Sequence, residues 1–274
     1  MQLKHLSSKS SLKKNSSIAW GLDSVPWNSI DFELVRPDKN LFYLIAAASF
    51  VEIAADLYSE NLARHFDDDQ EIVDWLQTSW GKEEVQHGET LRKYVKTVWP
   101  EFDWETAYAG FYKEYSKKCI VSSYESSQAL EMVARCVIET GTATFYEALA
   151  AQTTEPVLQG ITLNIRAEEI NHYKNFYYFF NKLASNHPVS RLRILFTIMS
   201  RLIEARNDDS ECALWHVYCN DKTNESEPNK AKFKKIYSRI AKVLKSQYPI
   251  AAGVKMLIKP LKLPPLIKNR IQFS

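Results

Sequence analysis

Hydrophobic positions repeat every three to four residues over most of this chain, which is the spacing of amphipathic α-helices. Polar or proline-containing segments interrupt the repeat at Asp67–Asp69, at Pro100 and at Thr153–Pro156. The stretch from Pro249 onward contains four prolines and cannot form one long helix. The pattern predicts an all-α protein with helices over residues 40–65, 70–97, 104–116, 122–152, 156–184, 188–206, 209–219 and 229–247.

Two of the predicted long helices share a polar motif. The segments Glu83-Glu84-Val85-Gln86-His87 and Glu168-Glu169-Ile170-Asn171-His172 each contain Glu-x-x-His preceded by a further Glu. Residues three apart lie on one face of a helix, so the carboxylate and imidazole of each motif can bind in the same metal region. One such motif is weak evidence in a chain with six histidines, whereas two copies on two long helices indicate a shared site.

Both motifs interrupt apolar stripes and should therefore face the core. The apolar neighbours at helical spacing are Val73, Leu76, Trp80, Leu91 and Val98 for the first motif, and Leu158, Ile165, Phe176 and Phe179 for the second. A buried carboxylate costs several kcal/mol unless it is protonated, paired or bound to a metal. No lysine or arginine recurs on either stripe, so a metal is the simplest explanation.

A di-iron site in a helix bundle needs one further Glu from each of two other helices. The first predicted helix offers Glu52, which lies in an almost wholly apolar segment where a solvated charge makes little sense. In an antiparallel hairpin, residues at equal depth are equally far from the turn. Glu52 and Glu84 are centred on residue 68, inside the predicted turn at Asp67–Asp69.

The helix predicted over 122–152 offers Glu131, Glu139 and Glu147. Glu139 and Glu169 are centred on residue 154, inside the second predicted turn, whereas the other two candidates would place the turn at residues 150 and 158, within predicted helices. Hairpin geometry therefore selects Glu139. The alternative is that Glu131, Arg135 and Glu139, which are spaced by four, form a solvent-exposed ion-pair stripe.

The predicted metal ligands are Glu52, Glu84, His87, Glu139, Glu169 and His172. Oxygen-rich ligation with imidazole suits two iron ions, or manganese, and lacks the thiolates of structural zinc. We expect Glu84 and Glu169 to bridge the metals and Glu52 and Glu139 to be terminal. The preceding Glu83 and Glu168 either bond the histidine N–H groups or are exposed helix charges.

Composition argues against nucleotide-binding, disulfide-bonded and membrane-spanning proteins. With seven glycines in 274 residues, the chain lacks glycine-rich nucleotide loops. Its four cysteines form no CxxC or metal-type spacing, which favours a reduced, cytoplasmic protein. The longest nearly apolar run, residues 41–51, is too short to cross a bilayer.

Charge divides the chain into three parts. Residues 1–30 are rich in Ser and Lys and are expected to form a flexible leader, residues 31–228 the helical metal domain, and residues 229–274 a basic extension. The extension carries twelve Lys or Arg and no acidic residue, which leaves 23 basic and 33 acidic residues, a net charge of −10, on the rest. This asymmetry predicts a polyanionic partner, or a tail that folds back on the acidic body. Apolar residues in Ile250–Ile258 interleave with lysines, so peripheral contact with an anionic membrane is a further expectation.

The first motif lies in a longer run, Trp80–Leu91, that resembles the W-x-x-E-E-x-x-H-G-x-x-L run of the soluble acyl-carrier-protein desaturases. Ala167–His172 is similar to their second A-[DE]-E-x-x-H run. The resemblance covers roughly residues 40–185 and implies a ferritin-like four-helix bundle with additional C-terminal helices. Those enzymes use a di-iron centre, dioxygen and electrons from ferredoxin to remove two hydrogens from a carrier-bound fatty acyl chain.

The resemblance also implies a catalytic residue and partners. Glu139-Thr140-Gly141-Thr142 matches the family's Glu-x-x-Thr, so Thr142 inherits the role of aiding proton delivery or oxygen positioning. Ala143 replaces an aromatic residue of many desaturases, which leaves the substrate's shape open. The implied partners are an acyl carrier protein or other acidic carrier and a ferredoxin-type reductant; we expect a homodimer and no nucleic acid. The resemblance also implies an apolar tunnel beside the metals. Four aromatic residues either line this tunnel or simply pack the core: Trp80, Phe145, Tyr146 and Phe176.

Other functions fit the same residues. A di-iron oxygenase of another small metabolite is one alternative, although an N-oxygenase would add a histidine on the last bundle helix, where residue 165 is Ile. A ferritin-like iron-binding or storage protein and a metal-free helical scaffold are the others.

Overall fold

The computed structural model describes residues 20–117, 124–204, 209–224 and 227–264, and every regular element within these ranges is helical. The all-α prediction is therefore confirmed for the described residues. The helices are α1 (Phe32–Val35), α2 (Lys39–Ile53), α3 (Asp56–His65), α4 (Gln70–Trp75), α5 (Gly81–Val98), α6 (Trp104–Tyr115), α7 (Gln128–Gln152), α8 (Pro156–Asn186), α9 (Arg191–Glu204), α10 (Asp209–Asn220), α11 (Lys230–Gln247) and α12 (Ile250–Leu257). Shorter segments are the 3₁₀ turns η1 (Leu22–Ser24), η2 (Trp27–Ser29) and η5 (Lys259–Leu261) and the π-helical η3 (Leu76–Trp80).

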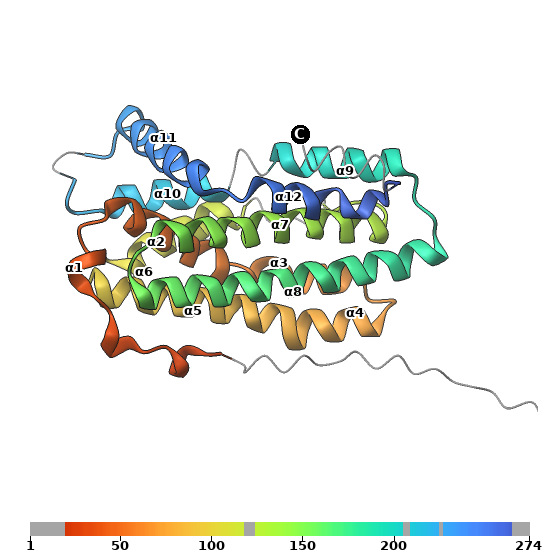
Figure 1. The fold of residues 1–274 in the computed structure, drawn as a ribbon, viewed down its shortest axis with the longest axis horizontal. Helices are drawn as coiled ribbons and strands as arrows, with labels where there is room; N and C mark the ends of the chain where they lie inside the picture. The colour runs from red at the N-terminus through yellow and green to blue at the C-terminus, as the bar shows by residue number, and fades with distance from the viewer. Residues whose placement is uncertain (1–19, 118–123, 205–208, 225–226, 265–274) are drawn as a thin grey trace, which may run out of the picture.

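Two helical hairpins run along the long axis of the molecule (Figure 1). In the first, α2 and α3 lead into a turn at residues 66–69, after which α4, η3 and α5 return. In the second, α7 and α8 are joined by residues 153–155. Glu155 caps α8 by accepting the N–H groups of Val157 and Leu158, and Pro156 occupies the first turn, where its missing N–H costs nothing. Both turns fall where the sequence places them.

Three helix boundaries differ from the prediction. The helix expected over 40–65 breaks at Ala54, whose ψ of 1° leaves the helical region. The helix expected over 70–97 contains the π-helical segment η3 one turn before the first metal motif. The helix expected from residue 122 begins at Gln128, after a serine-rich segment that favours a cap, and part of its predicted first turn lies outside the described residues.

Part of the expected leader packs on the helical domain. Residues 20–30 are placed against the bundle, with Val25 and Ile30 buried, and Gln86 donates a hydrogen bond to the carbonyl of Trp20. The expectation for residues 1–19 lies outside the described residues.

The apolar core is divided into two clusters. One gathers most of α2, the second half of α5 and the hairpin end of α7 and α8, and includes Phe50, Leu91 and Ile165. The other gathers α3, α4 and the opposite end of α7 and α8, and includes Leu62 and Phe176. A layer of buried polar residues lies between them and forms the candidate site.

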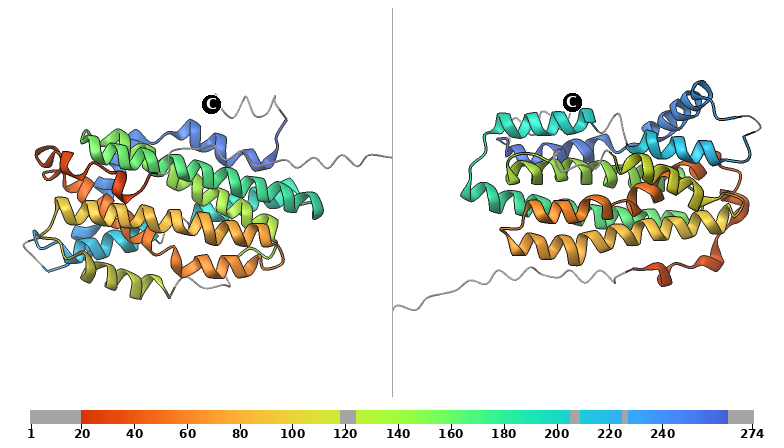
Figure 2. Two further views of the ribbon diagram at one scale, coloured as in Figure 1. Left: turned by 90° about the horizontal axis from the view of Figure 1, so that it is seen from below. Right: turned by 180° about the vertical axis from the view of Figure 1, so that it is seen from behind.

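Further helices cover the outside of the hairpins. Helices α9, α11 and α12 pack on α7, and α10 packs on α2 and α6. Figure 2 shows α9 and α11 on the same outer side of the molecule, away from α4 and α5. Within the described ranges, none of the helices combines the length and hydropathy of a membrane-spanning segment.

Candidate metal centre

All six predicted metal ligands are buried and converge on one place between the hairpins. No carboxylate among them is more than 6% exposed, and the two imidazoles are at most 1% exposed. They form two sets, each with ligand atoms within 4.8 Å of one another. The sets are Glu52, Glu84, His87 and Glu169, and Glu84, Glu139, Glu169 and His172. Glu84 and Glu169 belong to both, as expected of groups that would bridge two cations.

Close packing of α2 against α5 sets the position of Glu52. A Cβ on Gly88 would lie 2.4 Å from Ile53 Cγ1 and 2.6 Å from Ile53 N, so only glycine permits this approach. Because Ile53 follows Glu52 directly, the glycine after His87 has a packing role in this chain.

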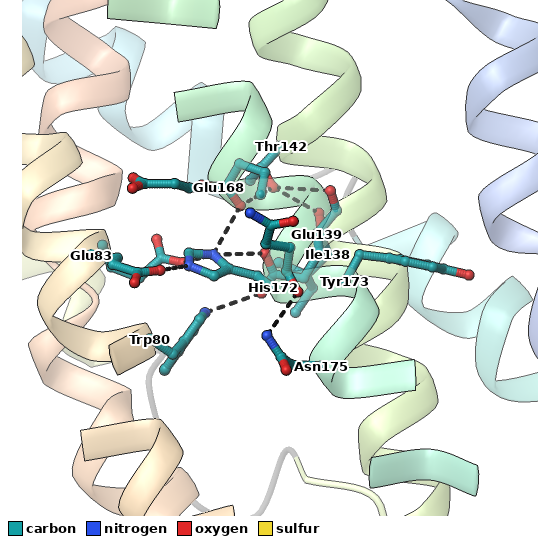
Figure 3. Close-up of polar contacts among 12 residues, drawn as sticks. Trp80, Glu83, Ile138, Glu139, Thr142, Glu168, His172, Tyr173 and Asn175 are labelled. Carbon is teal, nitrogen blue, oxygen red and sulfur yellow. Dashed lines mark hydrogen bonds and ion pairs between the residues drawn. The ribbon is translucent and has the colours of Figure 1, made fainter. Parts of the chain in front are cut away.

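The two histidines are held by reciprocal contacts between α5 and α8. His87 Nε2 lies 2.7 Å from Glu168 Oε2, and His172 Nε2 lies 2.7 Å from Glu83 Oε2 (Figure 3 shows the second pair). Each motif thus supplies one imidazole to the centre and one carboxylate that holds the imidazole of the other motif. These contacts bear out the first of the two expectations for Glu83 and Glu168.

Four buried atoms of the centre lack a well-aligned hydrogen bond, namely His87 Nδ1, His172 Nδ1, Glu139 Oε2 and Glu169 Oε1. Their nearest polar neighbours are other members of the centre: His87 Nδ1 lies 3.1 Å from Glu169 Oε1, and His172 Nδ1 lies 3.1 Å from Glu84 Oε1. A carboxylate beside Nε2 favours the tautomer that carries its proton there, which leaves the Nδ1 lone pair free to bind a metal. Four carboxylates and two such imidazoles can neutralise two divalent cations, so the residues fit a dinuclear metal.

Burial and mutual repulsion shift the pKa values of two carboxylates in the centre. Burial and the nearby charge of Glu169 raise the pKa of Glu139 to about 8. Burial and the same charge raise the pKa of Glu84 well above its ordinary value. Burial alone would lower the pKa of His172, but its hydrogen bonds to surrounding carboxylates outweigh that effect and raise it. Several negative charges thus share a small buried volume, and protons or cations must balance them.

Three further side chains donate hydrogen bonds to the carboxylates. Thr142 Oγ1 donates to Glu169 Oε2 at 2.8 Å, and Trp80 Nε1 donates to Glu139 Oε1 at 3.2 Å (Figure 3). The Tyr146 hydroxyl donates to Glu52 Oε1. Thr142 was expected at the centre, whereas Trp80 and Tyr146 were expected only as apolar lining. The available signal for Tyr146 was its position seven residues after Glu139, two turns along the same face of α7.

A tryptophan lies against each histidine ring. Trp20 stacks on His87 with 6.2 Å between ring centroids, and Trp75 meets His172 edge-on at 6.4 Å. No periodic pattern indicated Trp20, which comes from the segment expected to be a flexible leader.

The exposed stripe proposed as an alternative for α7 is not present. Glu131 and Arg135 are buried and paired at 2.6 Å, and Glu139 points into the centre. Two described cavities, of about 410 and 310 Å³, are lined by other residues, among them His65 and Tyr218. The apolar tunnel beside the metals stays a prediction.

A third group of potential ligands lies between α6 and α10. Glu114, Cys212 and His216 also have ligand atoms within 4.8 Å of one another, but Glu114 is exposed and its Oε2 lies 3.0 Å from His216 Nε2. This group lacks the burial and the unpaired inward atoms of the main centre.

No protein-family model matches the chain, and no curated protein matches it. The candidate centre is therefore interpreted from its own geometry.

Proposed function

We propose that the protein is a ferritin-like di-iron oxidoreductase that uses dioxygen to desaturate, or hydroxylate, a carrier-bound fatty acyl chain. The observation that carries the proposal is the pair of buried ligand sets that share Glu84 and Glu169. One Glu from each of two helices, with Glu-x-x-His from two others, is the arrangement of ferritin-like di-iron proteins. The thiolate-free, oxygen-rich ligation suits iron, or manganese.

In this proposal Glu52, His87, Glu139 and His172 would hold the iron pair together with Glu84 and Glu169, the two carboxylates that belong to both ligand sets. Bound iron supplies the activation of dioxygen, which the side chains alone cannot perform. The contribution of this chain is to fix the ligands, keep bulk water out and handle protons.

The surrounding residues fix the ligands. Glu168 and Glu83 would favour histidine tautomers with the proton on Nε2, which would leave each Nδ1 available to a metal. Trp80 and Tyr146 donate to terminal carboxylates and restrict their rotation.

Thr142 is the proposed catalytic residue. Its hydroxyl donates to Glu169, and its side chain is only half-buried on α7, so it reaches from the rim of the bundle to a shared carboxylate. A hydroxyl in this position can donate a proton to Glu169 and accept another from solvent. The match of Thr142 to the desaturase Glu-x-x-Thr supports the same role.

The identity of the substrate rests on the desaturase-like run at Trp80–Leu91. An acyl chain would need an apolar channel to the centre, which is part of this proposal. The basic residues after 229 would attract an acidic acyl carrier, and a ferredoxin-type protein would supply electrons. We further propose a homodimer.

The test is to incubate iron-loaded protein with an acyl carrier substrate, dioxygen and a reductant, and to weigh the acyl product by mass spectrometry. Desaturation consumes one dioxygen, two electrons and two protons, releases two waters, and leaves the acyl chain lighter by two hydrogens. Hydroxylation leaves it heavier by one oxygen. Recovery of only unchanged acyl chains from protein shown to contain iron would exclude this substrate class.

A further inference from the structure

Helix α9 exposes an apolar face. Its outward residues are Leu192 at 79% exposed, Leu195 at 44%, Phe196 at 75%, Met199 at 49% and Ile203 at 57%. Their spacing of three and four residues puts all five on one side of the helix. We call this set the α9 stripe. Apolar groupings of this kind on a protein surface mark contact sites.

The other side of α9 is already packed. Ile194, Thr197 and Ile198 are buried there, and the two isoleucines belong to the core cluster that includes α7. The stripe therefore faces away from the bundle, and the core contacts of α9 are made by its opposite side. Figure 1 shows α9 at the outer edge of the molecule, beyond α7.

Positive charge flanks the stripe. Arg191 and Arg193 precede and follow Leu192 and so project to opposite sides of it, because each residue turns a helix by about 100°. Arg191 also donates to the carbonyl of Lys262, which links α9 to the end of the basic extension. The acidic residue of α9 is Glu204, which lies at its end and is paired with Arg201 at 2.8 Å.

The same outer layer carries the basic extension. Residues 229–264 contain ten Lys or Arg and no acidic residue. On α11 the exposed basic residues are Lys230, Lys232, Lys234, Lys235, Arg239, Lys242 and Lys245. Helices α9, α11 and α12 all pack on α7, and Figure 1 shows α9 and α11 at opposite ends of the same outer side of the molecule, so the apolar stripe and the lysines belong to one side of the protein.

The charge pattern determines what can cover this side. A second copy of the chain would pair the layer with itself across a two-fold axis and bring its positive charges together. An anionic bilayer instead attracts Lys and Arg to its headgroups while apolar side chains enter the boundary with the acyl chains. We propose that the α9 stripe, flanked by Arg191 and Arg193, docks the protein on the surface of an anionic membrane.

The sequence indicated the extension as the membrane contact. Its residues Met256, Leu257 and Ile258 are partly buried against the core cluster of α3, α7 and α8, whereas Ile250 is 65% exposed. The extension supplies most of the charge, and α9 supplies the larger apolar surface.

Flotation of the full-length protein with vesicles tests the proposal. We expect binding to mixed phosphatidylcholine and phosphatidylglycerol and little binding to phosphatidylcholine alone. Phe196→Ser should weaken the partition by at least about tenfold. Met199→Ser should weaken it measurably, whereas Leu34→Ser, at an equally exposed position on α1, should not. All three positions are exposed, and far-UV circular dichroism verifies folding.

Three results would overturn the proposal. The first is no binding to either vesicle. The second is unchanged binding of Phe196→Ser and Met199→Ser to the anionic vesicles, which would assign binding to the lysines alone. The third is a dimer that Phe196→Ser dissociates, which would make the stripe a contact between copies. None of these results depends on the metal centre, so they leave the proposed reaction untouched.

Discussion

His87 Nε2 lies 2.7 Å from Glu168 Oε2, although the two residues belong to different helices and to different copies of the same motif. The mirror contact joins His172 to Glu83. Each motif therefore supplies both an inward-facing imidazole and a carboxylate for the opposite histidine. These two contacts, which we call the exchange, join α5 to α8 at the level of the candidate metal centre.

Removing one carboxylate of the exchange should weaken metal binding without removing a ligand. Glu168→Gln retains the shape of the side chain but loses the charge that favours an Nε2 proton on His87. We expect the apparent affinity for iron to fall by about tenfold. Isothermal titration of the metal-free protein with ferrous iron under anaerobic conditions measures this. Glu89→Gln, on a half-buried Glu that pairs with Arg92, should leave the affinity unchanged.

Loss of the Thr142 hydroxyl should separate catalysis from metal binding. Thr142→Val removes the hydrogen bond to Glu169 but no predicted ligand, so iron content should stay the same while kcat falls by about three- to tenfold. The matched control is Thr144→Val, because the Thr144 hydroxyl bonds only carbonyls of its own helix. Equal loss of activity in both variants would assign the effect to general damage to α7.

A methyl group at Gly88 should disturb both packing and metal binding. Gly88→Ala would drive a Cβ into Ile53, next to Glu52, and should lower the free energy of unfolding by about 2 kcal/mol. Iron content should fall in parallel, because Glu52 is displaced with its neighbour. In contrast, Gly160→Ala has open space and should be neutral or stabilising by up to about 1 kcal/mol. Urea unfolding of both variants measures the free energy of unfolding, and metal analysis measures their iron content.

Much of this arrangement could be predicted from the sequence, because it follows from periodicity and hairpin symmetry. Glu139 and Glu169 lie equally far from the turn at residues 153–155, which selects Glu139 over Glu131. The structure places Glu139 in the centre. Both turns are marked by local chemistry, namely a run of aspartates and a cap followed by proline.

The features that the sequence did not predict depend on contacts between distant segments. Trp20 lies in a non-helical segment before η1, so no helical repeat predicts its contact with His87. The break at Ala54 comes where α2 presses on Gly88, a contact 34 residues away along the chain. The α9 stripe follows the same helical periodicity as a core face, so only the structure shows which side of α9 is buried.

The stability of the metal-free protein should depend on pH in a defined direction. The pKa of Glu139 rises from its ordinary value of 4.5 to about 8, so the folded state binds this proton more tightly than the unfolded state. The free energy of unfolding should therefore fall as pH rises through that interval. Raised pKa values of His87 and His172 act in the same direction.

Chemical denaturation in the presence of a chelator, at several pH values up to about 9, measures this slope. Glu139→Gln should flatten it. Saturating iron should reverse it, because metal displaces the protons and binds more tightly as pH rises. A metal-free protein that gains stability between neutral and alkaline pH would contradict the assignment of shared protons to the centre.

The central claim is that the six buried residues bind a pair of metal ions. Metal analysis of the purified protein after anaerobic loading with ferrous iron and removal of excess tests it most directly. We predict two iron ions per chain, and almost none in Glu169→Ala, because that carboxylate belongs to both ligand sets. A wild-type protein that retains one ion or none, or a Glu169→Ala variant that retains two, would contradict the account.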